Sequence, residues 1–196
     1  MITPRREWRK LAIEGALIVL SVLLGLALSE WREGVQEQKL AHNALVNFRR
    51  EIAANLARLE KAQPGHAAMA QRLADANTGR GEQTAFDVFV ANMPEGGLDT
   101  QPLAAVAWET AEGTGALRLL DYETAALLSE TYTVQSATLL PTLQRLSDRF
   151  LSPGNFDPAQ RPQMVRTHRM LLVELSGQET YLMEIYRRAL AALPAK

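Results

Sequence analysis

The feature that constrains this chain most is an apolar run near its N-terminus. Residues Leu11 to Leu28 read LAIEGALIVLSVLLGLAL, and Glu14 is the one charged side chain among them. A run of this length is typical of a membrane-spanning helix. Trp8 and Trp31 bracket it 23 residues apart, about 35 Å along a helix, as expected of anchors at the two headgroup layers. The run therefore predicts a transmembrane helix over residues 11–29.

Basic residues predict which way this helix crosses the membrane. The span is preceded by Arg5, Arg6, Arg9 and Lys10, and the twelve residues after it hold Arg32 and Lys39. The positive-inside rule then leaves residues 1–10 as a cytoplasmic tail at the inner membrane and residues 30–196 as a periplasmic or extracellular domain. The alternative is a signal peptide cleaved after Ala27-Leu28-Ser29. We favour the uncleaved anchor, because the helical pattern continues past that point.

Composition excludes several classes of protein. The 196 residues carry a net charge of −1, so the basic surface that nucleic-acid binding requires is missing, and we expect no nucleic-acid partner. The chain has no cysteine, which excludes disulfides and thiolate zinc sites. No Walker A loop, HExxH motif, EF-hand loop or GxSxG elbow occurs, so we expect no enzyme and no cofactor.

The remainder of the chain predicts helices alone. Apolar residues recur at three- and four-residue spacings from residue 30 to 63, and Pro64-Gly65 predicts a break or kink before a second piece that ends near Asn77. Shorter helices are expected after a Thr84–Asp87 capping box and over residues 102–112. Asp121 should cap a long helix over residues 122–151, kinked at Pro141.

The last helix, which follows Asp157-Pro158, has the clearest pattern. Steps of four and three residues define a seam suited to packing on a neighbouring helix. Its residues are Met164, His168, Leu171, Leu175, Gln178, Leu182, Ile185 and Ala189. We therefore expect an all-α protein, in which the transmembrane helix continues into an antiparallel helical bundle.

Glu14 is the unusual residue of the span. Glu14, Ser21 and Gly25 lie within about 40° of one another on a helix, and Ser29 extends the stripe. Small residues every four positions allow a second helix to approach, and Glu14 can hydrogen-bond across the contact. The alternatives are that Glu14 reaches water or Lys10 at the cytoplasmic boundary, or that it belongs to a proton or ion pathway.

Two blocks of the sequence resemble a family of uncharacterised bacterial single-span membrane proteins. The first consists of Glu14, the run IVLSVLLGLA over residues 18–27, and Glu30-Trp31-Arg32. The second consists of Trp108-Glu109-Thr110-Ala111, Thr114-Gly115-Ala116-Leu117, Leu120-Asp121-Tyr122, Leu128-Ser129, Tyr132 and Gln135. The resemblance implies a short cytoplasmic tail and a helical extracytoplasmic domain, and it supplies no catalytic residue.

Two further groups of residues are candidate sites. Trp108, Tyr122, Tyr132 and Gln135 are interpreted as core, with a ligand or partner groove as the alternative. His66 and His168 both fall on apolar helix faces, so each is expected to be a core histidine, with a pH-sensing pair as the alternative.

These observations predict a membrane-anchored interaction or scaffold protein whose partners are the lipid bilayer and either further copies of itself or another membrane protein. Two other functions remain open. One is a sensor or accessory subunit that binds a ligand in its helices, and the other is a proton- or ion-conducting oligomer centred on Glu14.

Overall fold

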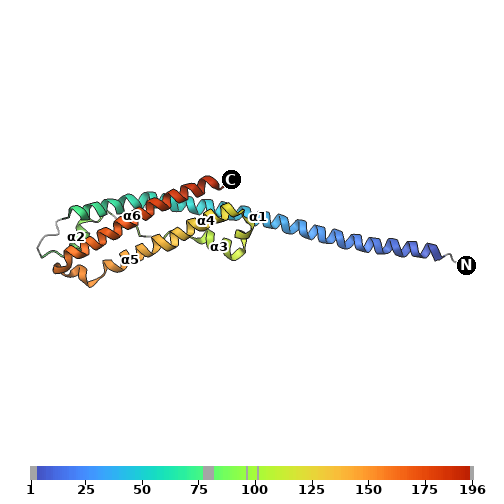
Figure 1. Cartoon of the computed structure of the whole chain (residues 1–196), viewed down its shortest axis with the longest axis horizontal. Helices are drawn as coiled ribbons and strands as arrows, with labels where there is room; N and C mark the ends of the chain where they lie inside the picture. Colours follow the sequence, from blue (N-terminus) through green and yellow to red (C-terminus); the bar gives the residue numbers. More distant parts are fainter. Residues whose placement is uncertain (1–3, 77–81, 96, 101, 195–196) are drawn as a thin grey trace. The chain divides into compact units, whose positions relative to one another are not determined.

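The computed structural model describes residues 4–76, 82–95, 97–100 and 102–194, with side chains described from residue 14 onward. All regular elements in these residues are helical, as predicted (Figure 1). The α-helices are α1 (Pro4–Asp75), α2 (Ala85–Asn92), α3 (Val106–Thr114), α4 (Tyr122–Val134), α5 (Leu140–Phe150) and α6 (Arg161–Ala192). Short 3-10 turns cover Ala116–Leu119, Pro153–Phe156 and Pro158–Gln160, and a π-helical turn covers Gln135–Leu139.

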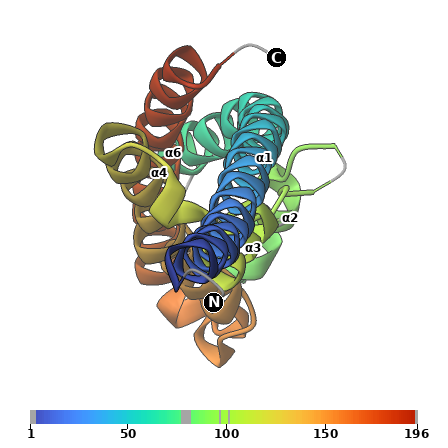
Figure 2. The same cartoon turned by 90° about the vertical axis from the view of Figure 1, so that its right-hand side faces the viewer.

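The chain divides into two compact units, Met1–Asn43 and Ala44–Lys196, and the boundary falls within α1. Helices of the second unit pack along one another. Arg49 donates hydrogen bonds to the Leu190 and Leu193 carbonyls at 2.7 and 2.8 Å, and Gln63 donates to Ser176 Oγ at 2.9 Å. Residues later in α1 thus contact residues earlier in α6, so these two helices run in opposite directions. In the end-on view of Figure 2, α4 and α2 lie on opposite sides of the unit.

The core of the second unit is formed by α1, α2, α4, α5 and α6. Its fully buried side chains include Phe48, Ile52, Phe89, Leu128, Leu172, Leu175, Leu182, Ile185 and Tyr186. The predicted seam of α6 is confirmed, because six of its eight residues are buried and the other two, Leu171 and Gln178, are half-buried. Burial of an aliphatic or aromatic side chain contributes roughly 1.5 to 3 kcal/mol, so this seam orders α6 against its neighbours.

Two prolines behave differently from one another. Of the break or kink expected at Pro64-Gly65, the break is wrong, because α1 continues as one helix through Pro64 to Asp75. Buried Ala62, His66 and Met69 flank the proline on both sides, and their burial holds the helix together despite one lost backbone hydrogen bond. The expected end near Asn77 lies outside the described residues. At Pro141 the prediction of two segments is confirmed, since a π-helical turn separates α4 from α5 just before it.

The expected caps are present, but one helix start is wrong. Thr84 and Asp87 form the predicted capping box of α2, and Asp121 accepts a hydrogen bond from the Thr124 amide at the start of α4. Helix α3 begins at Val106 instead of Pro102. The buried Asn55 amide bonds both the amide and the carbonyl of Ala104, which holds this segment outside a helix.

Candidate functional site

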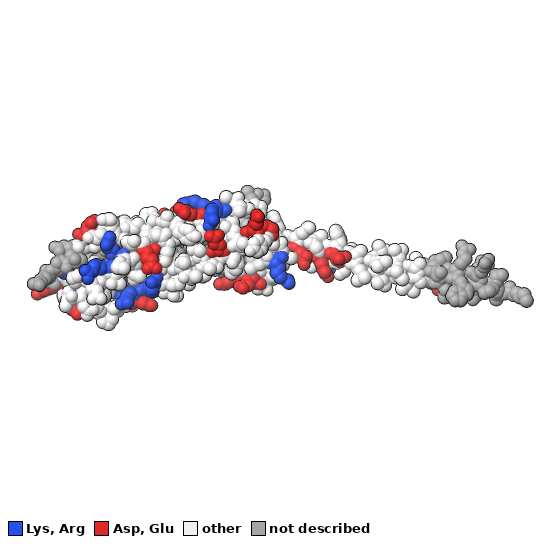
Figure 3. Space-filling view, in the orientation of Figure 1, with Lys and Arg blue, Asp and Glu red and all other residues white. Residues whose placement is uncertain are grey.

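The first candidate surface is the apolar segment of α1. Its large side chains are 52–66% exposed, and they are Leu17, Ile18, Val19, Leu20, Val22, Leu23, Leu24, Leu26, Leu28 and Trp31. Successive residues of a helix point in every direction around it, so the segment is uncovered on all sides. Figure 3 shows this part of the chain as uncharged surface. Among the described residues, α1 is the one helix long and apolar enough to cross a membrane.

The small-residue stripe lies on this segment. Glu14, Ser21, Gly25 and Ser29 are all exposed. Ser21 Oγ donates to the Leu17 carbonyl at 2.7 Å within its own helix, and a Cβ atom at Gly25 would meet no atom within 4 Å. The stripe is thus open to a neighbouring helix. The side chains of Trp8 and Lys10 lie outside the described residues.

The second candidate feature is a buried ionisable pair between α1 and α6. His66 Nδ1 lies 2.8 Å from Glu179 Oε1, and the two residues are 1% and 2% exposed. Two other atoms of the pair, His66 Nε2 and Glu179 Oε2, are buried without a hydrogen-bond partner. Because a buried carboxylate is costly unless it is paired, this contact fixes the register of α1 on α6.

A polar cavity of about 450 Å³ lies beside His66. Pro94, Glu95 and residues 97–100, which follow α2, form one wall, and the α1 residues Lys61, Ala62, Gly65 and His66 form the other. Both signs of charge occur around it, from Lys61 on one wall and from Glu95 and Asp99 on the other. The volume suits a small polar molecule.

His168 has a different environment and does not meet His66. Its Nδ1 donates to the Met164 carbonyl at 3.0 Å, and its ring lies 4.1 Å from the Phe89 ring centroid. On α6, residues 168 and 179 are eleven positions apart, about 16 Å along the axis. The structure therefore gives each histidine its own partner and does not form the pH-sensing pair. Burial, with a smaller contribution from Arg149, lowers the pKa of His168 below 6.5.

This pKa predicts a loss of stability in mild acid. Folded His168 takes up its proton at a lower pH than the same residue in the unfolded chain, whose pKa is about 6.5, so the free energy of unfolding should fall as pH decreases from there. Urea unfolding of the wild type and of His168→Phe, at about pH 7 and about pH 5.5, measures this effect. The wild type should lose more stability than the variant. Equal losses would contradict the assignment, since all other titrating groups are shared.

The aromatic corner is part of the core. Trp108 stacks on Tyr132 with ring centroids 5.4 Å apart, and Phe48 lies 5.8 Å from Tyr132. Gln135 accepts a 2.6 Å hydrogen bond from the Tyr186 hydroxyl and donates to the Ala104 carbonyl at 3.0 Å. Of the four predicted groove residues, Tyr132 and Gln135 are thus buried, and Trp108 is half-buried against Tyr132. Tyr122 is 86% exposed and lies outside this cluster.

Sequence reasoning missed two glutamates that organise these contacts. Glu51 accepts hydrogen bonds from the Tyr132 hydroxyl at 2.7 Å and from the Ala107 amide at 3.0 Å, so it ties α1 to both α4 and α3. Burial, together with the bond to Glu51, raises the pKa of the Tyr132 phenol, which keeps it a donor.

The second glutamate that sequence reasoning missed is Glu179. It follows Leu175 by four residues and precedes Leu182 by three, which is the spacing of the buried seam.

Comparisons with protein-family models, with curated proteins and with solved structures find no match to this chain. The class that the described residues define is an all-helical protein with one candidate membrane-spanning helix.

Proposed function

We propose that this protein is a non-enzymatic, membrane-anchored interaction or scaffold protein. Residues 11–29 cross the cytoplasmic membrane, residues 1–10 form a cytoplasmic tail, and residues 30–196 form an antiparallel helical bundle on the periplasmic or extracellular side. The observation that carries the proposal is the apolar segment of α1, which none of the described residues buries. A core helix of a soluble protein would have most of such a segment covered.

Lipid is the environment that suits this segment. Each exposed leucine, isoleucine or valine gains on the order of 1 kcal/mol or more when its remaining apolar surface leaves water. Backbone polar groups in the segment are satisfied within the helix, as a membrane span requires. Uncharged residues 15–29 follow Glu14, so the one ionisable group lies near the end of the span that faces the cytoplasm in this orientation.

Self-association is the second part of the proposal. Glu14, Ser21, Gly25 and Ser29 present a narrow polar stripe to the lipid, and a second copy can cover it. Close helix approach over Gly25 gains dispersion contacts, and Glu14 gains a hydrogen-bond partner in a medium that offers few others. Ser21 is already bonded to its own backbone, so its role here is its small size.

Native mass spectrometry of the full-length protein in lipid nanodiscs tests this part. Gly25→Leu should shift the oligomer toward monomer, because the larger side chain separates the two helices, and Glu14→Gln should weaken it less. Gly15→Leu is the matched control: it makes the same change about 80° away on the helix and should leave the oligomer intact. An oligomer that tolerates both Gly25→Leu and Glu14→Gln would contradict association through the stripe.

The polar cavity beside His66 favours a second candidate function, that of a sensor or accessory subunit. A ligand held there would contact α1, the helix that also carries the apolar segment. The same nanodisc spectra distinguish the two functions. A small molecule retained by monomers would favour the sensor, whereas a ligand-free homo-oligomer would favour the scaffold.

A further inference from the structure

The outward face of α6 carries apolar side chains that no described element covers. Met170, Val173 and Tyr181 are 69%, 53% and 51% exposed. Between them lies Gly177, where a Cβ atom would meet nothing within 4 Å. These residues follow one another at steps of three or four, so they lie along one side of the helix, and it is the side opposite the buried seam.

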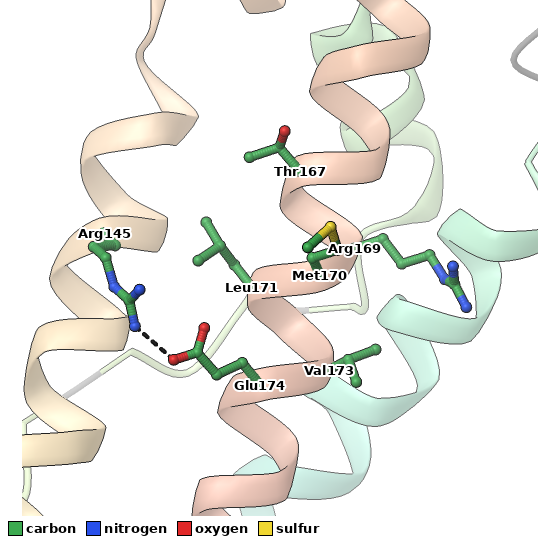
Figure 4. Close-up of a pocket in the computed structure, with 7 residues that line it drawn as sticks. All are labelled: Arg145, Thr167, Arg169, Met170, Leu171, Val173 and Glu174. Carbon is green, nitrogen blue, oxygen red and sulfur yellow. Dashed lines mark hydrogen bonds and ion pairs between the residues drawn. The ribbon is translucent and has the colours of Figure 1, made fainter.

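A cavity of about 580 Å³ lies along the N-terminal half of this face, between α6 and α5. It is lined by Arg145, Thr167, Arg169, Met170, Leu171, Val173 and Glu174. Figure 4 shows Arg169 and Glu174 extending from opposite sides of α6, with Met170 between them. An apolar strip with a cation on one side and an anion on the other is the arrangement of a helix that pairs with another helix.

The spacing of these residues specifies the partner. In a parallel two-stranded coiled coil, heptad positions a and d form the seam, and position g of one helix meets position e of the other five residues further along. With Met170 at a and Val173 at d, Gly177 is the next a position. Arg169 is then at g and Glu174 at e, five residues apart. Two copies of α6 would therefore form two symmetric Arg169–Glu174 pairs.

Both charged groups are able to make this contact. Arg169 is exposed and has no hydrogen bond to a described residue. Glu174 accepts hydrogen bonds from Arg145 at 2.6 Å, from Gln178 at 3.1 Å and from Thr142 at 3.3 Å, and all three reach Oε1. None of the described residues donates to its other carboxylate oxygen, Oε2, which can accept from a second cation.

We propose that α6 pairs in parallel with α6 of a second copy of this chain, through Met170, Val173 and Gly177 and the two Arg169–Glu174 pairs. The inference rests on the proposed function for its direction, because two chains anchored in one membrane present α6 in the same orientation. The apolar strip is short, and anchoring supplies the high local concentration that a weak contact needs. The glycine allows the two backbones to approach closely.

Single-cysteine crosslinking in membranes tests the interface, and the natural chain contributes no cysteine of its own. Val173→Cys places two thiols across the two-fold axis, so mild oxidation should give a covalent dimer. Val90→Cys in α2 is the matched control, since Val90 is 54% exposed and has the same side chain. Adding Arg169→Glu to Val173→Cys places the introduced glutamate of one copy against Glu174 of the other, and the crosslinked dimer should fall about tenfold. Arg50→Glu in the same Val173→Cys background should leave the dimer unchanged.

Equal crosslinking at Cys positions introduced for Val173 and Val90, or a dimer that tolerates Arg169→Glu, would overturn the α6 interface. Sedimentation of the same samples with membranes tests the anchor separately. If the chain sediments with membranes but crosslinks equally at the two sites, only the α6 interface is contradicted. If it crosslinks selectively through Val173→Cys but does not sediment with membranes, only the proposed anchor is contradicted.

Discussion

Replacing both Leu20 and Leu23 with arginine is expected to release the protein from the membrane. Both leucines lie in the middle of the apolar segment and are 52% and 57% exposed, so the substitutions create no clash within the chain. On insertion scales, each arginine at the centre of a span raises the free energy of insertion by about 2.5 to 3.5 kcal/mol. The favourable contribution of each replaced leucine is lost as well. The combined cost is enough to prevent stable insertion. Alkaline extraction of membranes, followed by detection of the protein in pellet and supernatant, measures it.

Leu151→Arg is the matched control for this experiment. Leu151 is 74% exposed at the end of α5, outside the proposed span. The Leu151→Arg protein should therefore remain in the pellet. Intact mass measurement on the wild type distinguishes the anchor from the signal-peptide alternative. The proposed anchor would be contradicted by a mass that corresponds to a chain beginning after Ser29, or by a double variant that stays in the pellet.

His66→Leu is expected to destabilise the second unit strongly. It leaves the Glu179 carboxylate buried without the imidazole, and breaking a buried pair in this way costs about 3 to 5 kcal/mol. Glu179→Leu should cost less, about 1 to 3 kcal/mol, because the group left unpaired is then a ring N–H donor and not a carboxylate. The double variant His66→Leu with Glu179→Leu should recover much of the loss, since apolar side chains often replace a buried pair without penalty. Urea unfolding near neutral pH measures all three.

The exposed pair Arg187–Glu60 provides the comparison. It also joins α6 to α1, at 2.7 Å, but both side chains are about half exposed, and Arg187→Ala should cost less than about 1 kcal/mol. Similar losses for His66→Leu and Arg187→Ala would mean that the His66–Glu179 contact does not behave as a buried pair. Additive losses in the double variant would exclude a direct interaction.

Local patterns in the sequence were sufficient for the helical class, for two helix caps, for the seam of α6 and for the apolar segment. Helix caps depend on residues three apart, as at Thr84 and Asp87, and the seam of α6 depends on spacings of three and four. Pro64 does not end α1, because its cost to a helix is local while its compensation is not. That compensation comes from buried Ala62, His66 and Met69, which the sequence alone does not show to share one core.

Partners across the core were decided by tertiary structure. His66 and His168 are both buried on the apolar faces that the sequence predicts, but the carboxylate that His66 contacts lies on α6, and the ring that His168 packs against, Phe89, lies on α2. Glu179 is 113 residues from His66, and no local rule connects the two. The start of α3 likewise depends on Asn55, 49 residues away from Ala104. What the sequence determined by itself is therefore the helical class, the apolar segment and the buried faces of α1 and α6, because these follow from periodicity. Only the tertiary structure decided which polar groups meet, because pairing depends on the register of helices distant in sequence.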